Sequence, residues 1–155
     1  MSVSSAAACI VNRDRRLADG PIDANRSALM RRIRGKNTAP ERAVRQVAHS
    51  LGYRFRLHRR TLPGTPDMTF PRLRKVIFVH GCFWHRHPGC RRTTTPKTRT
   101  AYWQAKFQRN MERDRRNVAS LQALGWDVLV VWECETLDRV GLVATLSQFL
   151  GGASA

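Results

Sequence analysis

Two short, uninterrupted apolar runs constrain the fold of this chain more than any other feature of its sequence. Residues 76–79 and 128–132 lack the polar alternation of a half-exposed strand, so each run predicts a strand that is buried on both faces. Between them, apolar side chains at helical spacing predict a long helix over residues 100–124, which Gly125 ends. Two buried strands joined through a helix predict a sheet that is covered by helices.

Weaker patterns complete the predicted order. Thr38, Pro40 and Glu41 form a capping box with proline in the first turn, which predicts a helix to residue 51. Apolar and basic residues alternate over 53–57 and predict a half-buried strand, and a short strand is expected at 67–70 after a Pro-Gly turn. We expect a short basic helix at 27–34, a loop at 81–99 and a closing helix at 137–150. This order indicates a single α/β domain with a mixed central β-sheet flanked by helices.

The charge of the chain points to its partner. Its 155 residues include 28 Lys and Arg against 11 Asp and Glu, a formal net charge of +17. A surplus of this size in a chain with a normal core predicts a polyanionic partner such as nucleic acid. The dominance of arginine favours bidentate contacts with phosphates and base edges.

The ends of the sequence and its cysteines bear on the domain boundaries and on the cellular compartment. Residues 1–22 show no periodicity and are expected to form a flexible extension before a domain at 23–150. No apolar run approaches the ~18–20 residues that span a bilayer, and no signal peptide is recognised, so we expect no membrane association and a cytoplasmic protein. In that compartment the four cysteines are expected to be thiols or metal ligands rather than disulfides.

Part of the predicted loop carries soft metal ligands. Cys82, His87 and Cys90 lie within nine residues, and Cys134 follows the second buried strand. Thiolates and imidazole are the ligands that zinc prefers, and four of them close a tetrahedral structural site. His85 is a rival ligand, and ordinary buried or incidental cysteines are the alternative reading. Spacing alone leaves these possibilities open.

The few acids occupy informative positions. Asp114 falls on the apolar stripe of the predicted long helix, so it must be paired, for example with a neighbouring arginine, or be hydrogen-bonded or bound to a cation. Glu41 also shares an apolar face, although its place in the capping box is a sufficient structural reason. Asp67 has no capping role, and His80 ends the central strand. Carboxylates that hold Mg²⁺ and imidazoles that move protons suit metal-assisted phosphodiester hydrolysis.

Large aromatic side chains lie within the basic segment. Phe83 and Trp84 belong to the predicted loop, and Tyr102 and Trp103 begin the long helix beside Lys106. Aromatic groups next to cations can wedge between bases and unstack them. Core packing is the alternative for one of the pair at the start of the helix.

Taken together, these residues resemble the very short patch repair (Vsr) endonucleases over residues 23–135. The matching blocks include the motifs Leu62-Pro63-Gly64-Thr65-Pro66-Asp67 and His80-Gly81-Cys82-Phe83-Trp84-His85, together with residues 26–30, 33–38, 40–41, 110–114, 124–126 and 132–134. One departure is that the central strand ends in Val79-His80, without the acid-x-Lys pattern of the wider nuclease superfamily.

The resemblance implies a restriction-endonuclease-like fold with a structural zinc site, and a DNA endonuclease that depends on Mg²⁺. Such enzymes nick one strand 5′ of the thymine in a T:G mismatch, which arises when 5-methylcytosine deaminates. The implied partners are double-stranded DNA with that mismatch, a cytosine DNA methyltransferase as a functional link, and mismatch-repair proteins, and the expected state is a monomer. A restriction-type endonuclease that cuts undamaged DNA and a non-catalytic zinc-containing DNA-binding protein are the alternatives.

The resemblance also assigns roles by position. The five residues that it implies for catalysis are Glu41, Asp67, His80, His85 and Asp114. Among them, Asp67 would bind magnesium together with the backbone carbonyl of Val79, His85 would be the general base, and His80 would assist at the scissile phosphate. The two other acids would hold water in the metal shell and orient the histidines.

Two further sets follow from the same resemblance. The implied zinc ligands are Cys82, His87, Cys90 and Cys134. The implied DNA-binding residues are Met30 on the minor-groove side, the major-groove wedge Phe83, Trp84 and Trp103, and the neighbouring Lys106 and Asn110.

Overall fold

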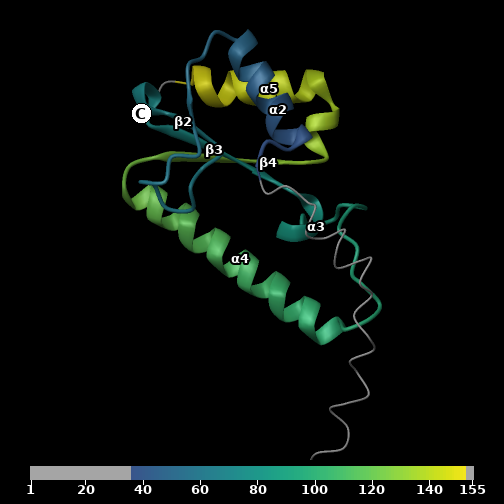
Figure 1. Cartoon of the computed structure of the whole chain (residues 1–155). Helices are drawn as coiled ribbons and strands as arrows, with labels where there is room; N and C mark the ends of the chain where they lie inside the picture. The colour runs from purple at the N-terminus through teal and green to yellow at the C-terminus, as the bar shows by residue number, and fades with distance from the viewer. Residues whose placement is uncertain (1–35, 153–155) are drawn as a thin grey trace, which may run out of the picture.

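The computed structural model describes residues 36–152, which fold around one four-stranded sheet (Figure 1). The strands are β1 (Arg56–Leu57), β2 (Met68–Phe70), β3 (Lys75–His80) and β4 (Asp127–Trp132), in that spatial order. β1 pairs with β2 and β2 with β3 antiparallel, whereas β3 and β4 are parallel. The predicted mixed α/β sheet is therefore confirmed. The predictions for residues 1–22, for the helix at 27–34 and for Met30 lie outside the described residues.

Helices cover both faces of this sheet. α2 (Ala39–Ser50) and α5 (Arg139–Gly151) lie on one face, and α4 (Thr100–Ala123), part of the connection between the parallel strands, lies on the other (Figure 1). β3 is buried along almost its whole length because Ile77 packs in the core beneath α2 and α5, whereas Val76 and Phe78 pack with α4 and its following turn. This two-sided burial explains the uninterrupted apolar run in the sequence.

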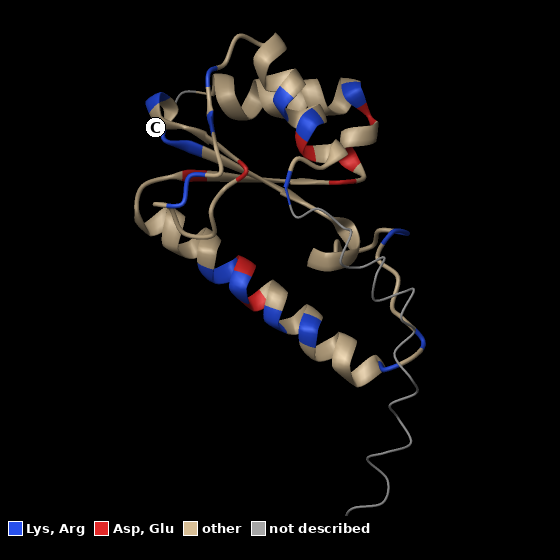
Figure 2. Cartoon of the chain, in the orientation of Figure 1, with Lys and Arg blue, Asp and Glu red and all other residues tan. Residues whose placement is uncertain are grey.

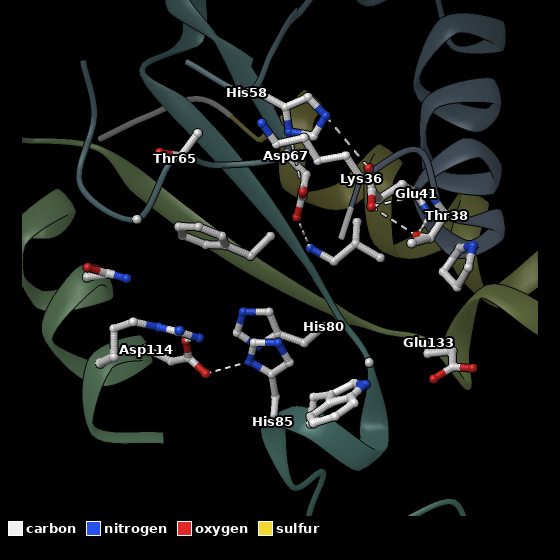
Figure 3. Close-up of a pocket in the computed structure, with 18 residues that line it drawn as sticks. Lys36, Thr38, Glu41, His58, Thr65, Asp67, His80, His85, Asp114 and Glu133 are labelled. Carbon is white, nitrogen blue, oxygen red and sulfur yellow. Dashed lines mark hydrogen bonds and ion pairs between the residues drawn. The ribbon is translucent and has the colours of Figure 1, made fainter. Parts of the chain in front are cut away.

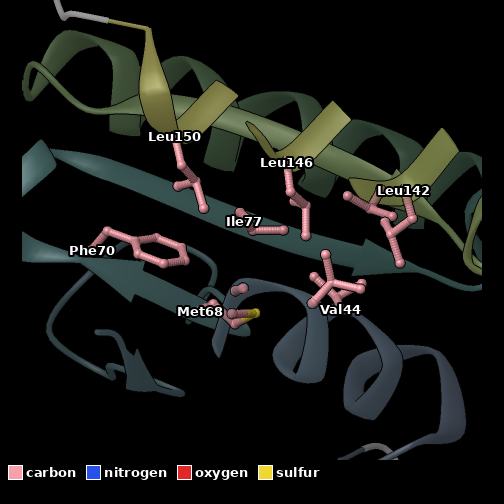
Figure 4. Close-up of a cluster of buried hydrophobic side chains, with 10 residues drawn as sticks. Val44, Met68, Phe70, Ile77, Leu142, Leu146 and Leu150 are labelled. Carbon is pink, nitrogen blue, oxygen red and sulfur yellow. The ribbon is translucent and has the colours of Figure 1, made fainter. Parts of the chain in front are cut away.

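The larger core lies beneath α2 and α5. Leu142, Leu146 and Leu150 recur every four residues along α5 and face Ile77 of the sheet and Val44 of α2 (Figure 4). Full burial of one such side chain contributes about 1.5–3 kcal/mol to stability. This core fixes β2, β3 and α2, whose ends carry the polar side chains described below.

The capping box predicted for α2 is present. The Thr38 hydroxyl accepts a hydrogen bond from the Glu41 amide, and the Glu41 carboxylate accepts one from the Thr38 amide. α5 begins at Arg139, two residues later than predicted, because the Asp138 side chain accepts from the amides of Val140 and Gly141. Residues Glu135–Leu137 form a separate 3₁₀ turn.

Two predictions of local structure need correction. The strand expected over residues 53–57 is paired only at Arg56–Leu57, although Tyr53 and Phe55 still pack edge-on against Phe70. The alternation of apolar and basic residues over 53–57 therefore reflects how the side chains pack, and the strand pairing with β2 is limited to Arg56 and Leu57. The loop expected over 81–99 contains a short helix, α3 (Cys82–His85). Within residues 36–152, no helix combines the length and the apolar character needed to cross a bilayer.

Candidate active site

A cavity of about 980 Å³ opens where the end of β3 meets the start of α2 and the middle of α4. Six titratable side chains that line it fall into two groups (Figure 3). These groups are Glu41 with His58 and Asp67, and His80 with His85 and Asp114. In each group the potential metal-binding atoms lie within 4.8 Å of one another. The structure therefore brings together all five side chains that the sequence resemblance assigned to catalysis.

The histidine group forms because the chain turns sharply after β3. His80 ends the strand, Gly81 precedes α3, and the turn of α3 brings His85 back over His80, with stacked ring centroids 3.9 Å apart. Asp114 reaches the pair from α4, and its Oδ2 lies 2.5 Å from His85 Nδ1 (Figure 3). An ionised carboxylate can only accept a hydrogen bond, so this contact places a hydrogen on Nδ1 of His85. The opposite ring nitrogen then has a lone pair when the ring is neutral.

Electrostatics set the protonation states of this group. Burial, followed by the charge of His85, lowers the pKa of His80 to about 4, so its ring is uncharged at neutral pH. Burial would raise the pKa of Asp114, but the hydrogen bond and charge of His85, with Arg113 contributing, outweigh it and lower that pKa. Asp114 is thus an ionised carboxylate whose negative charge is stabilised by neighbouring protein groups.

The acid group is arranged around Asp67. Asp67 follows Pro66 at the entrance to β2, and its Oδ2 accepts a hydrogen bond of 2.7 Å from the amide of Val79 on β3. Burial, reinforced by the charge of Glu41, raises the pKa of Asp67 even though the Val79 amide, His58 and Arg45 act in the opposite direction. The protein groups around Asp67 therefore do not fully offset the cost of burying its negative charge. A bound cation would stabilise the charged form of such a carboxylate.

The turn before Asp67 is held close to α4. Gly64 has φ +72°, and a Cβ at this position would lie 2.7 Å from Nδ2 of Asn117. Only glycine combines this left-handed backbone with so close an approach. The contact seats the 62–66 turn against α4 and so fixes the entry of the chain into β2.

Glu41 and His58 complete the acid group. Glu41 is 4% exposed and binds Arg45 at 2.7 Å, in addition to its role in the capping box. His58 lies 3.8 Å from both carboxylates, measured to Glu41 Oε2 and Asp67 Oδ1. No sequence motif singled out His58, which directly follows β1 (Arg56–Leu57). Its position directly after a strand, the feature that drew attention to His80, was the available signal.

A third group contains the four predicted zinc ligands. The donor atoms of Cys82, His87, Cys90 and Cys134 lie within 4.8 Å of one another, and His87 Nδ1 is 3.3 Å from Cys134 Sγ. His87 also stacks on Trp132, with ring centroids 4.3 Å apart. The structure thus groups His87 with the cysteines, whereas His85, the rival ligand, contacts Asp114.

The thiols of this group differ in their surroundings. Burial raises the pKa of Cys82 to about 12 and also raises that of Cys134, whereas the Arg92 amide lowers the pKa of Cys90. Three thiols and one imidazole whose donor atoms lie this close together fit a tetrahedral zinc ion, which would bind the cysteines as thiolates.

The predicted DNA-binding aromatics also meet in space. Phe83 packs edge-on against Trp84 and Trp103, with centroids 5.0 and 5.8 Å apart. The ammonium of Lys106 lies 5.1 Å from the ring centre of Trp84 and 5.4 Å from that of Trp103. Asn110 donates from Nδ2 to the carbonyl of Trp84 at 3.3 Å. All five residues belong to α3 or to the first half of α4.

Arg86, for which no role was predicted, supports this aromatic cluster. It adopts the left-handed conformation at the end of α3 and places its guanidinium 4.4 Å from the ring centre of Phe107. The same guanidinium donates to the Thr94 carbonyl and the Thr95 hydroxyl. Arg86 therefore ties the loop after α3 to α4.

Positive charge follows the same elements. Figure 2 shows Lys and Arg along α4 and in the loop that precedes it. The residues concerned are Arg91, Arg92, Lys97, Arg99, Lys106, Arg109, Arg113, Arg115 and Arg116. Arg113 of α4 lines the cavity, and Lys106 lies over the rings of Trp84 and Trp103. Acids and histidines in one cavity beside a basic, aromatic surface define a candidate nuclease site.

Comparison with known proteins identifies the family. The family model described as DNA mismatch endonuclease Vsr matches residues 18–92. The type II nicking enzyme V.XorIIP of Xanthomonas oryzae pv. oryzae is 56% identical over 125 residues, covering 81% of this chain and 91% of that protein. The DNA mismatch endonuclease Vsr of Escherichia coli is 42% identical over 144 residues, covering 90% of this chain and 92% of that protein. The type II nicking enzyme V.NmeAIP of Neisseria meningitidis is 39% identical over 114 residues, covering 74% and 81%.

This chain therefore belongs to the Vsr family of DNA mismatch endonucleases. The resemblance inferred from its sequence motifs is confirmed.

Proposed function

We propose that this protein nicks one strand of double-stranded DNA 5′ of the thymine in a T:G mismatch, and so starts very short patch repair. The observation that carries the proposal is one cavity that holds both Asp67 and the His85–Asp114 pair, next to basic side chains and a half-buried aromatic cluster. The names of the relatives, a mismatch endonuclease and several nicking enzymes, support the same reaction. The nuclease unit would span residues 23–150, with a restriction-endonuclease-like sheet.

The residues of the acid group fit a magnesium ion. Carboxylate and carbonyl oxygens are the donors that Mg²⁺ prefers, and Asp67 with the carbonyl of Val79 would supply them, with Glu41 nearby to hold a metal-bound water. Magnesium, when bound, supplies charge stabilisation at the scissile phosphate. The raised pKa of Asp67 supports this assignment, because a cation would stabilise its charged form.

The histidine group would handle protons. Asp114 holds a hydrogen on Nδ1 of His85, which leaves the other nitrogen of a neutral ring free to accept a proton from the attacking water. His80, kept uncharged by burial, can form a hydrogen bond to the phosphate or to that water without competing for the proton. Arg113 and Lys36 also line the cavity and can neutralise the phosphate.

The four ligands of the Cys/His group would hold a structural zinc ion. Its ligands come from α3, the loop that follows and the turn after β4, so the metal would anchor this loop to the end of the sheet. Cys82 and His85 belong to the same short helix, and the zinc ion would therefore also position the general base.

Removal of zinc tests that assignment. We expect the purified protein to contain about one zinc per chain, and chelation to lower its melting temperature and promote aggregation. Cys90→Ser should weaken zinc retention, whereas Ser50→Ala, a substitution on α2 away from the cluster, should not. An unchanged melting curve after complete removal of zinc would argue against a structural metal.

The aromatic cluster would read the mismatch. Phe83, Trp84 and Trp103 can wedge into the base stack from the major groove, with Lys106 and Asn110 as polar contacts and Met30 on the minor-groove side. Unstacking a base step costs a few kcal/mol, and a mismatch lowers this cost. The preference for mismatched DNA would follow from that difference. A cytosine DNA methyltransferase would be the functional partner, because deamination of its product creates the T:G pair.

A nicking assay on one set of duplexes tests the function. Duplexes of identical sequence would contain T:G, T:A or C:G at one position, with label on either strand, in the presence and absence of Mg²⁺. We expect Mg²⁺-dependent nicking of the thymine strand in the T:G duplex only. Equal cleavage of matched DNA would indicate a restriction-type nuclease instead, and tight binding without any nicking would indicate a DNA-binding protein.

The same duplexes test the wedge. Trp84→Ala should reduce the preference for T:G over matched DNA by about tenfold, because stacking on an aromatic ring is worth roughly 1–3 kcal/mol per base. Trp126→Phe, which alters a tryptophan packed against the sheet, should leave the preference unchanged. Unaltered selectivity in Trp84→Ala would remove Trp84 from the wedge.

A further inference from the structure

His58 occupies an unusual position between the two acids of the cavity. Its ring bridges α2 and β2, 3.8 Å from Glu41 Oε2 through Nε2 and 3.8 Å from Asp67 Oδ1 through Nδ1 (Figure 3). The side chain is only 19% exposed. Its backbone has φ +46°, a left-handed conformation that residues other than glycine seldom adopt. Such conformations concentrate at functional sites, where surrounding contacts hold a side chain in a required position.

The partner on the far side of the ring fixes its tautomer. Arg45 Nη2 lies 3.2 Å from Nε2 of His58, and a guanidinium can only donate hydrogen bonds. Nε2 must therefore offer its lone pair, and the ring hydrogen is on Nδ1. That hydrogen faces Oδ1 of Asp67, the oxygen that the Val79 amide leaves free by binding Oδ2.

Arg45 extends the connection to the second acid. The same Nη2 donates to Glu41 Oε2 at 2.7 Å, and Nη1 donates to Asn37 Oδ1 at 2.6 Å. Glu41, Arg45, His58 and Asp67 thus form a chain of polar contacts that links α2 to β2. A carboxylate held by neighbours in this way keeps one orientation, which a metal ion requires of its ligand.

We infer that His58 is a positioning residue, which donates from Nδ1 to Asp67 and aligns this carboxylate for metal binding without itself coordinating the ion. The inference rests on the proposed role of Asp67 as a magnesium ligand. The present 3.8 Å separation is longer than a direct hydrogen bond, and a shift of about 1 Å or one bridging water closes it.

Direct coordination by His58 is the competing arrangement, since its nitrogens lie close enough to both acids. Coordination through Nδ1 would require the other tautomer. That tautomer places a hydrogen on Nε2 opposite the donor group of Arg45, where two donors would face each other. The contact with Arg45 therefore favours positioning over coordination.

The test measures metal binding directly, with Mn²⁺ as the probe and the zinc-loaded full chain as the protein. Free Mn²⁺, quantified by its paramagnetic resonance signal, gives Kd independently of nicking. We expect His58→Leu to raise the Kd about tenfold, within the 10–100-fold range for residues that orient metal ligands. His58→Gln should stay within about threefold of the parent, because its amide can accept from Arg45 and donate to Asp67. An unchanged Kd in His58→Leu would overturn the inference.

Two controls make the outcome specific. If His58→Leu does not fold, His58→Asn replaces it, because the shorter amide cannot reach both partners, and its Kd should exceed that of His58→Gln. Asp67→Ala should abolish binding at this site. If it does not, the proposed magnesium site fails, whereas loss in Asp67→Ala with normal binding in His58→Leu refutes the role of His58 alone. A bound-Mn²⁺ nitrogen coupling that disappears in His58→Gln would show direct coordination and overturn positioning.

Kinetics should agree with the binding data. With Mg²⁺, His58→Leu should raise the half-saturating metal concentration for T:G nicking by a similar factor, with kcat at saturating Mg²⁺ reduced less than threefold. A large loss of kcat that excess Mg²⁺ does not restore would contradict a role confined to aligning the metal ligand.

Discussion

Two partly buried carboxylates of the cavity, Asp67 and Asp114, have pKa values that shift in opposite directions. Burial dominates at Asp67 and raises its pKa, whereas at Asp114 the hydrogen bond and charge of His85, together with His80 and Arg113, outweigh burial and lower the pKa. Both acids contact histidine, but the Asp114–His85 distance is 2.5 Å and the Asp67–His58 distance is 3.8 Å. The protein therefore stabilises the negative charge of Asp114 but not fully that of Asp67. We interpret Asp114 as a group that orients the base His85, and Asp67 as a group that would bind a cation.

Replacement of Asp67 should have the largest effect on the rate of nicking. Asp67→Ala is expected to reduce T:G nicking at least about 10³-fold, because a metal ligand is lost, while DNA affinity changes less than threefold. Nicking rates and gel-shift affinities on the same duplex measure both quantities. Asp127→Ala, which removes an exposed acid at the far end of the sheet, is the control. Retained Mg²⁺-dependent nicking in Asp67→Ala would exclude Asp67 from the metal site.

Neutralising Asp114 should have a smaller effect on the rate of nicking. Asp114→Asn keeps the shape of the side chain but no longer favours a hydrogen on Nδ1 of His85, so we expect nicking to fall about 10²-fold at saturating Mg²⁺. The half-saturating Mg²⁺ concentration should change little, in contrast to substitutions around Asp67. A variant whose defect disappears at high Mg²⁺ would contradict this division between the two acids.

The histidine group also predicts a pH dependence of stability. The pKa of His80 is lowered to about 4, so the folded protein resists a proton that the unfolded chain accepts near pH 6.5. The free energy of unfolding should therefore fall as the pH decreases from about 6.5 toward 4, by about 2 kcal/mol at pH 5 relative to neutral pH. Asp114 contributes in a different range, since its lowered pKa gives stability that is lost only below about pH 4.

Urea unfolding at pH 7 and pH 5 measures this effect, with no Mg²⁺ added. His80→Gln should lose about 2 kcal/mol less than the parent between these two pH values, because the variant lacks the titrating ring. Identical losses in the two proteins would show that His80 is not the group that senses pH.

The sequence predicted those parts of the fold that local rules determine. Both apolar runs form strands, but only β3 is buried on both faces, as at Val76 and Ile77. The prediction of two-sided burial was wrong for β4, which lies at the edge of the sheet and buries only Val131 fully. The start of α2 was recognisable because Thr38 and Glu41 satisfy each other's backbone within three residues. The limits of β1 depend on contacts with β2 farther along the chain, so the alternation of side chains overstated its length.

Lys75 illustrates what local rules miss in the fold. Charged residues are seldom buried, yet Lys75 is 4% exposed and donates to the carbonyls of Phe149 and Gly152 at the end of α5. These partners lie more than 70 residues away along the chain. No periodicity within the β3 segment could have indicated them.

The candidate site shows the same limit. Asp67 and Asp114 were conspicuous because each stands where local structure gives it no role, and the motifs that surround them resemble a known family. His58 lacked such a motif, and its importance comes from Arg45 and Asp67, which lie 13 residues before it and nine after it in the sequence. Only the folded chain shows that its ring lies between them.

The most direct test follows the carboxyl carbons of Asp67 and Asp114 by ¹³C NMR during a pH titration of the zinc-loaded protein, with and without Mg²⁺. Without Mg²⁺, Asp67 should titrate above the ordinary value of 3.8 and Asp114 below it. Mg²⁺ should lower the apparent pKa of Asp67 and shift that of Asp114 much less, because Asp67 is the proposed magnesium ligand. An Asp67 pKa at or below 3.8 without Mg²⁺, or a Mg²⁺ effect confined to Asp114, would contradict the division of roles between the two acids.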